Sequence, residues 1–142
     1  LAVTEDGQIP LGEQYRIPTH RWTLEIPAGK LDGADEDPFV CAQRELSEET
    51  GLTADHWRKL TVLETTPGFC NERIHLYLAT GLHAGKTHPD EDEFLEVLRV
   101  PFEEAVRQCM DGTLTDAKTV AAVLKGRLLR ERACAPAADA IH

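Results

Sequence analysis

The chain has 142 residues and a mass of 15.8 kDa, and 42% of its residues are hydrophobic, which predicts one domain with its own core. The formal net charge of −10 argues against a broad nucleic-acid-binding surface, and no segment approaches the roughly 20 apolar residues of a membrane span or resembles a signal peptide. We therefore expect a cytoplasmic protein without nucleic-acid or membrane partners, forming one domain over residues 1–142, with a frayed tail at 133–142 and an N-terminal segment missing before Leu1.

The first half of the chain predicts strands followed by a sharply bounded helix. Residues 2–4 and 8–17 are strand-like. Residues 21–26 show the period of a half-buried strand, in which one face carries Trp22, Leu24 and Ile26 and the other carries Arg21, Thr23 and Glu25. Pro27-Ala28-Gly29 ends that strand. Asp37 as N-cap before Pro38, and Gly51 as the stop, predict a helix over 38–50.

The second half predicts further strands and two more helices. Strand-like segments lie at 59–65, 74–80 and 94–100, and a helix is expected at 101–110. A last helix at 116–132 is capped by Thr115 or Asp116, with apolar positions at Val120, Val123, Leu124 and Leu128. Strands mixed with three helices, without a regular βαβ alternation, indicate an α+β fold or an α/β/α sandwich.

Three carboxylates gather on one side of the helix predicted at 38–50. At about 100° per residue, the side chains of Glu45, Glu48 and Glu49 project in similar directions. Like charges at this spacing each cost a few tenths of a kcal/mol, whereas hard cations prefer carboxylate oxygens as ligands. The helix is therefore suited to binding Mg²⁺. A solvated acidic surface is the alternative that the helix alone leaves open.

A longer pattern around this helix resembles the signature of the Nudix hydrolase family. That signature is a Gly, a loop Glu and then R-E-U-x-E-E-x-G-U, where U is aliphatic; here it reads Gly29, Glu36 and RELSEETGL over 44–52. The departure is one extra residue between Gly29 and Glu36. Asp35 stands at the strict spacing, but we prefer Glu36 because its distance to Arg44 is the usual one.

The resemblance implies a Nudix-type α/β/α sandwich with a mixed β-sheet and assigns roles to the signature residues. Glu45 and Glu49 would be the main Mg²⁺ ligands, with Mn²⁺ as an alternative ion, and Glu48 would be a further ligand or catalytic group. The Ala28 carbonyl would complete the coordination. Structural positions of the motif would be Gly29, Glu36, Arg44 and Gly51, with Arg44 pairing Glu36.

Further residues resemble the ADP-ribose pyrophosphatase branch of the family. They are Pro27-Ala28-Gly29-Lys30, Thr66-Pro67-Gly68-Phe69, the acidic segment at 90–97 and Asp116-Ala117-Lys118-Thr119. The branch implies hydrolysis of ADP-ribose to AMP and ribose 5-phosphate, or of a related nucleoside diphosphate sugar, by a homodimer. A non-catalytic nucleotide-sensing domain and a nucleoside triphosphate pyrophosphohydrolase are the alternatives.

The same branch supplies candidates for the base and for substrate binding. Glu91 is expected as general base, with Glu93 as an additional ligand or its partner; their order is open. Residues expected to contact substrate are Arg16 on the diphosphate, Glu25 in the nucleotide pocket, Phe69 beside a base or ribose, and Glu72 on ribose or metal.

Overall fold

The structure is a computed structural model that describes residues 1–85 and 96–134. In chain order, its elements are β1 (Gln8–Arg16), a 3₁₀ turn (Ile17–Thr19), β2 (Arg21–Glu25), α1 (Pro38–Thr50), β3 (Leu52–Glu64), β4 (Arg73–Ala84), β5 (Glu96–Pro101), α2 (Phe102–Asp111) and α3 (Ala117–Cys134). This mixture confirms the α+β class. None of the helices in the described part of the chain is long and apolar enough to cross a membrane.

The described strands form two antiparallel groups. β1 lies between β2 and β5, with Arg16 opposite Arg21 on one side and Ile9 opposite Val100 on the other. β3 and β4 form a long hairpin with a register irregularity between Lys59 and Thr61. An isolated parallel bridge joins Ala2 to Ala79 of β4. Among the described residues, this bridge supplies the parallel pairing that the predicted mixed sheet requires.

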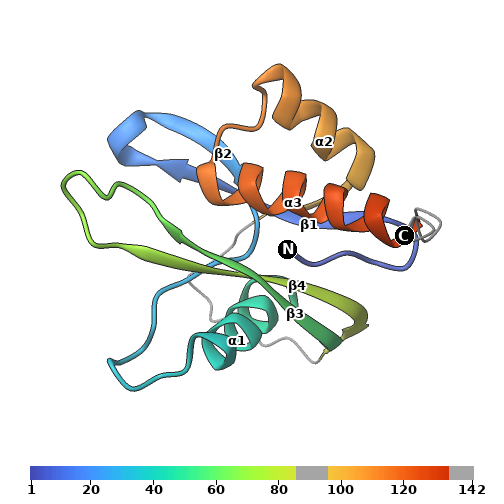
Figure 1. Ribbon diagram of the computed structural model, residues 1–142, viewed down its shortest axis with the longest axis horizontal. Coiled ribbons are helices and arrows are strands. Elements are labelled where there is room, and N and C mark those ends of the chain that lie inside the picture. The colour runs from blue at the N-terminus through green and yellow to red at the C-terminus, as the bar shows by residue number, and fades with distance from the viewer. Residues whose placement is uncertain (86–95, 135–142) are drawn as a thin grey trace, which may run out of the picture.

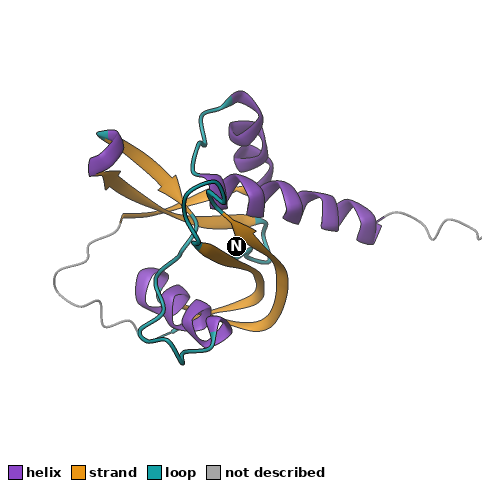
Figure 2. Ribbon diagram, turned by 60° about the vertical axis from the view of Figure 1, so that its left-hand side comes forward, coloured by secondary structure: helices purple, strands orange, loops and turns teal. Residues whose placement is uncertain are grey.

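Helices cover both sides of the β3–β4 hairpin, as the sandwich prediction requires. α1 packs against β3 and β4 from one side, α3 packs from the other, and α2 packs against α3 (Figures 1 and 2). The main core lies on the α3 side. Its most deeply buried members come from three elements: Ile9 and Leu11 on β1, Ala105 on α2, and Ala122 and Val123 on α3.

Local end signals placed the helices well, whereas strand lengths depended on pairing. α1 has the predicted bounds of 38–50, and α2 begins directly after Pro101. β3 begins at Leu52, immediately after α1, instead of at 59. Residues 53–58 contain Asp55 and His56 and carry no clear strand pattern; they become a strand because β4 pairs with them along its length.

The predicted apolar face of α3 is wrong in part. Leu128 is 58% exposed. Val123 is buried as predicted, and the buried face also contains Thr119, Ala122 and Gly126. A Cβ on Gly126 would lie 2.8 Å from Leu1 Cδ2, so the helix packs closest where its side chains are smallest.

The alternation over residues 21–26 predicts burial only in part, because Ile26 is buried and Leu24 packs against the main core, as expected, but Trp22 and Glu25 do not follow the pattern. Trp22 is 66% exposed, whereas the Glu25 carboxylate is 3% exposed. The end of the β1–β2 pair projects beyond the helices in Figure 1. Trp22 packs edge-on against Tyr15 there, with ring centroids 5.5 Å apart. Glu25 lies at the other end of β2, where two cations meet its carboxylate.

Candidate active site

The acidic helix, α1, has well-defined ends that fix where its glutamates lie. Asp37 Oδ1 accepts a hydrogen bond of 2.7 Å from the Phe39 amide, and Pro38 occupies the first turn. Gly51 ends the helix in the left-handed conformation, with a φ of 72°. Between these ends, Glu45, Glu48 and Glu49 lie where the sequence predicted them.

The turn after β2 lies directly against two of these carboxylates. The Ala28 amide donates to Glu49 Oε2 at 3.2 Å. A Cβ on Gly29 would lie 1.9 Å from Glu45 Oε1, so the carboxylate occupies the space that any side chain at position 29 would need. Gly29 is therefore required by close approach and not by backbone conformation, since its φ is not in the left-handed region.

Arg44 ties the loop to the helix. Its Nε and Nη2 donate to the two oxygens of Glu36, each at 3.2 Å. Its Nη1 donates to Glu45 Oε1 at 2.9 Å and to Glu48 Oε2 at 3.2 Å. The hydrogen bonds from Arg44 and the Asp32 amide hold the pKa of Glu36 below its usual value. One guanidinium thus neutralises charge that would otherwise force the loop and helix apart.

Glu45 differs electrostatically from Glu36. Burial raises the pKa of Glu45, and the hydrogen bond from Arg44 only partly opposes that rise. A nearby cation would oppose this rise in the pKa of Glu45.

The donor set fits a hard divalent cation. Oxygen is the only donor element that Glu45, Glu48 and Glu49 offer, and this is what Mg²⁺ and Mn²⁺ require of carboxylate sites. Within residues 1–85 and 96–134, no three acidic, His or Cys side chains are already gathered as a metal site. Arg44 bonds both Glu45 and Glu48, and Glu48 is 57% exposed.

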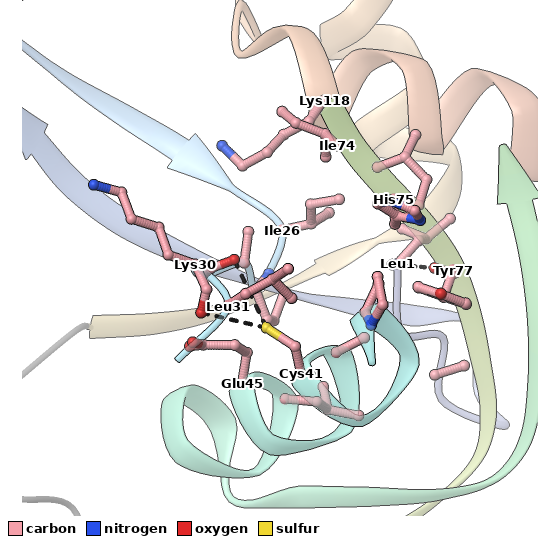
Figure 3. Close-up of a pocket in the computed structure, with 18 of the residues that line it drawn as sticks. Leu1, Ile26, Lys30, Leu31, Cys41, Glu45, Ile74, His75, Tyr77 and Lys118 are labelled. Carbon is pink, nitrogen blue, oxygen red and sulfur yellow. Dashed lines mark hydrogen bonds between the residues drawn. The ribbon is translucent and has the colours of Figure 1, made fainter. Parts of the chain in front are cut away.

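A cavity of about 730 Å³ opens beside this helix (Figure 3), within the usual size range of small-ligand sites. Glu45, Ala28 and Gly29 line it from the signature, and Arg16 and Glu72 line it from elsewhere. Phe69 is not among the lining residues and is 88% exposed. The predicted substrate residues are therefore only partly brought together.

Sequence reasoning missed several cavity residues. Among them are Lys30, Arg73, His75 and Lys118. His75 Nδ1 is buried without a hydrogen-bond partner among the described residues. Asp116-Ala117-Lys118-Thr119 was noticed as a motif, but nothing local indicated that Lys118 bonds Glu25, 93 positions away.

Glu25 does not line the cavity, although the sequence predicted it in the nucleotide pocket. Its carboxylate is absent from the cavity wall and accepts hydrogen bonds from Arg16, Lys118 and Thr23. Burial alone would raise the pKa of Glu25, but these hydrogen bonds outweigh it and lower the pKa to about 2. Glu91 and Glu93 lie outside the described residues.

Comparison with known proteins identifies the family. A family model described as the NUDIX domain matches residues 1–123. The chain belongs to the Nudix family. This Nudix chain is 45% identical over 125 residues to an ADP-ribose pyrophosphatase of Bacillus subtilis (strain 168), covering 87% of this chain and 67% of the relative.

Other Nudix relatives carry different names. A methanol dehydrogenase activator of Bacillus methanolicus is 42% identical, with 87% of this chain and 67% of the relative covered. A GDP-mannose pyrophosphatase of Cronobacter sakazakii (strain ATCC BAA-894) is 37% identical, with 82% and 64% covered. The chain thus spans about two thirds of the length of these relatives.

A solved structure supports the Nudix fold independently. The crystal structure of an ADP compounds hydrolase superposes with a TM-score of 0.79, at 23% identity, covering 94% of this chain and 72% of that one. At this identity the match shows the fold alone.

Proposed function

We propose that this Nudix protein hydrolyses the diphosphate bond of ADP-ribose or a related nucleoside diphosphate sugar, using a divalent cation, with Mg²⁺ favoured and Mn²⁺ as the alternative. The observation that carries the proposal is the cavity, which has Glu45 of the acidic helix on its wall together with the cations Arg16 and Lys118. The Glu45 carboxylate suits a metal, and the Arg16 guanidinium suits phosphate oxygens. The names of the relatives at 45% and 37% identity support the substrate class.

The signature residues would hold the cation. Glu45, Glu49 and the Ala28 carbonyl are the proposed ligands, with Glu48 as a further one. When bound, the cation would neutralise phosphate oxygens and lower the pKa of an attacking water. Gly29 leaves room for the Glu45 carboxylate, and Arg44 with Glu36 keeps the loop against the helix.

The chain itself would bind and orient the diphosphate. Arg16 is 46% exposed, and Glu25 engages two of its five N–H groups, which leaves N–H groups available to donate to phosphate oxygens. Glu91 would take a proton from the water as a P–O bond forms and the anhydride P–O bond breaks. For ADP-ribose, the products are AMP and ribose 5-phosphate.

The deciding experiment is a hydrolysis panel with Mg²⁺. It contains ADP-ribose, several nucleoside diphosphate sugars including ADP-glucose and GDP-mannose, NADH, diadenosine polyphosphates and dATP, with product identification. We expect ADP-ribose or a nucleoside diphosphate sugar to give the highest kcat/KM. Preferred cleavage of dATP to dAMP and pyrophosphate would contradict the proposal and favour a triphosphate pyrophosphohydrolase.

The acidic segment is tested with paired variants. Glu91→Gln should lower kcat by roughly 10²–10⁴-fold, as expected for loss of a general base, with a smaller change in KM. Glu93→Gln is the matched variant. A larger loss in Glu93→Gln than in Glu91→Gln would reverse the two roles.

A regulatory role is the second candidate, because one relative is named as an activator of another enzyme. Binding of ADP-ribose without turnover of any panel member would favour this role over catalysis.

We propose a homodimer as well. Exposed apolar side chains of Tyr15, Ile17 and Trp22 at the end of the β1–β2 pair support an interface there. Light scattering should give twice the monomer mass of 15.8 kDa, and a monomer at assay concentrations would contradict it.

A further inference from the structure

A buried carboxylate next to the cavity is held by two cations from distant parts of the chain. Glu25 is 3% exposed. Arg16 donates to it through Nε at 2.7 Å and through Nη2 at 2.5 Å, and Lys118 Nζ donates to Oε2 at 2.6 Å. Removing one partner from a buried ion pair usually leaves the charge of the other uncompensated. Both cations therefore compensate the buried negative charge of Glu25.

The two cations are engaged differently. Lys118 has three N–H groups, and its Nζ contacts Glu25 and both oxygens of Asp116, the latter each at 3.0 Å. It is therefore fully engaged and is 12% exposed. Arg16, by contrast, is 46% exposed and uses only part of its fork on Glu25. Of the two, Arg16 is the one suited to touching a ligand.

The first turn of α3 fixes the position of Lys118. Asp116 Oδ2 accepts from the Thr119 amide at 3.1 Å and from its hydroxyl at 2.6 Å. The Ile26 amide, next to Glu25, in turn donates to Thr119 Oγ1 at 3.0 Å. The start of α3 is thus bonded both to the Glu25 side chain and to the backbone that follows it, which leaves Lys118 little freedom.

The charges in this cluster balance. Arg16 and Lys118 offset Glu25 and Asp116, so this side of the cavity carries no net charge from these four groups. Without Lys118, this side would be anionic, and Arg16 would be the one cation left on Glu25 among the described residues. Both changes would disfavour a diphosphate, because the cavity would repel it and Glu25 would compete for Arg16.

We infer that Lys118 is a positioning residue for diphosphate recognition: it offsets Glu25, so that Glu25 orients Arg16 toward the cavity without making that side of the cavity anionic. This inference rests on the proposed function, because it takes the diphosphate as the ligand of Arg16. It adds a residue of α3, far from the signature in sequence, to the recognition of the substrate.

The first test separates KM from kcat. Lys118→Met should raise the KM for ADP-ribose by about tenfold or more, the effect of losing one well-aligned charge-assisted hydrogen bond. We expect kcat and the Mg²⁺ concentration at half-maximal rate to stay within about twofold. Lys125→Met, on the exposed side of α3, is the matched control and should equal wild type. An unchanged KM in Lys118→Met would overturn the inference. A purely structural role of Lys118 would give that result, because a smaller fraction of folded enzyme lowers only the apparent kcat.

A double-mutant cycle tests whether Lys118 acts through Arg16. Arg16→Met should raise KM at least as much as Lys118→Met, and the double variant should be no worse than Arg16→Met alone. Multiplying effects in the double variant would mean that Lys118 acts independently, which would overturn the positioning role.

A charge-neutral pair protects the test against misfolding. Lys118→Met combined with Glu25→Gln leaves no buried unpaired carboxylate, so it should fold even where Lys118→Met does not. Its KM should still be raised, because a neutral glutamine at position 25 cannot hold Arg16 by two charged hydrogen bonds. A wild-type KM in this folded pair would refute the role.

Equilibrium binding separates this inference from the proposed function. The Kd for ADP-ribose is measured by calorimetry in EDTA, where no metal-dependent turnover occurs. If wild type binds ADP-ribose in EDTA but hydrolyses no member of the substrate panel with Mg²⁺, the proposed function fails, while about tenfold weaker binding by Lys118→Met would still support the inference. Wild type that hydrolyses ADP-ribose, with equal Kd in Lys118→Met, overturns the inference alone. If wild type neither binds ADP-ribose nor hydrolyses any nucleoside diphosphate sugar of the panel with Mg²⁺, both the proposed function and the inference are overturned.

Discussion

Replacing Gly29 by Ala tests the proposed metal site with a single methyl group. The added Cβ would lie 1.9 Å from Oε1, 2.1 Å from Cδ and 2.5 Å from Oε2 of Glu45. To reach an ordinary contact of 3.4 Å, the nearest oxygen must move by about 1.5 Å (3.4 minus 1.9). The carboxylate is the far end of a flexible side chain, so it moves while the backbone stays.

The expected consequence is a folded protein with an impaired site. A displacement of about 1 Å in a positioned group can cost about 10²-fold in rate, or close to 2.7 kcal/mol of transition-state stabilisation. We therefore expect Gly29→Ala to lower kcat by about 10²-fold and to weaken activation by Mg²⁺. Stability should be unchanged or raised by up to about 1 kcal/mol, because Ala restricts the unfolded chain and position 29 has no left-handed φ.

The assay combines ADP-ribose hydrolysis over a Mg²⁺ titration with urea unfolding. Gly33→Ala is the matched control, because a Cβ at Gly33 in the same loop meets nothing within 4 Å. A Gly29→Ala enzyme with kcat and Mg²⁺ dependence within about twofold of the Gly33→Ala enzyme would refute the placement of Glu45 in the site. Loss of folding in Gly29→Ala alone would refute the reasoning that only the side chain must yield.

The carboxylates and the Thr119 hydroxyl give three further predictions. Glu49→Gln, like Glu45→Gln, should abolish turnover with little loss of fold, and near-wild-type kinetics at saturating Mg²⁺ would remove these residues from the metal site. The pKa of Glu25 is lowered to about 2 in the folded protein, so its contribution to stability is present above its unfolded pKa and is lost as pH falls from about 4.5 toward 2. The difference in unfolding free energy between wild type and Glu25→Gln should therefore shrink over that range, by an amount on the order of 3 kcal/mol, and a pH-independent difference would contradict the ion cluster. Thr119→Val should destabilise the protein by about 1–3 kcal/mol in chemical unfolding, because the buried Ile26 amide loses its acceptor; an unchanged unfolding midpoint would show that this hydrogen bond is replaced.

The helix that carries the signature could be predicted from sequence because its signals are local. Asp37 and Pro38 at the start and Gly51 at the end act within one turn of each terminus, so the bounds of 38–50 followed without tertiary information. The spacing of Glu45, Glu48 and Glu49 is likewise a property of the helix itself. The pattern from Gly29 to Leu52 was long enough to indicate the family, which the comparison confirmed.

The tertiary structure decided which polar groups meet across the chain. Glu25 sits in an alternating strand, yet it is buried because Arg16 and Lys118 neutralise it there. No local rule links Glu25 to Lys118, which lies 93 positions later, because that contact exists only where the end of β2 meets the first turn of α3. The sequence by itself determined the acidic helix and its ends through short-range hydrogen bonding and conformational preference. Only the tertiary structure, which brings the first turn of α3 to the end of β2, determined the charge balance beside the cavity, since electrostatic partners in a low-dielectric interior are chosen by distance in space.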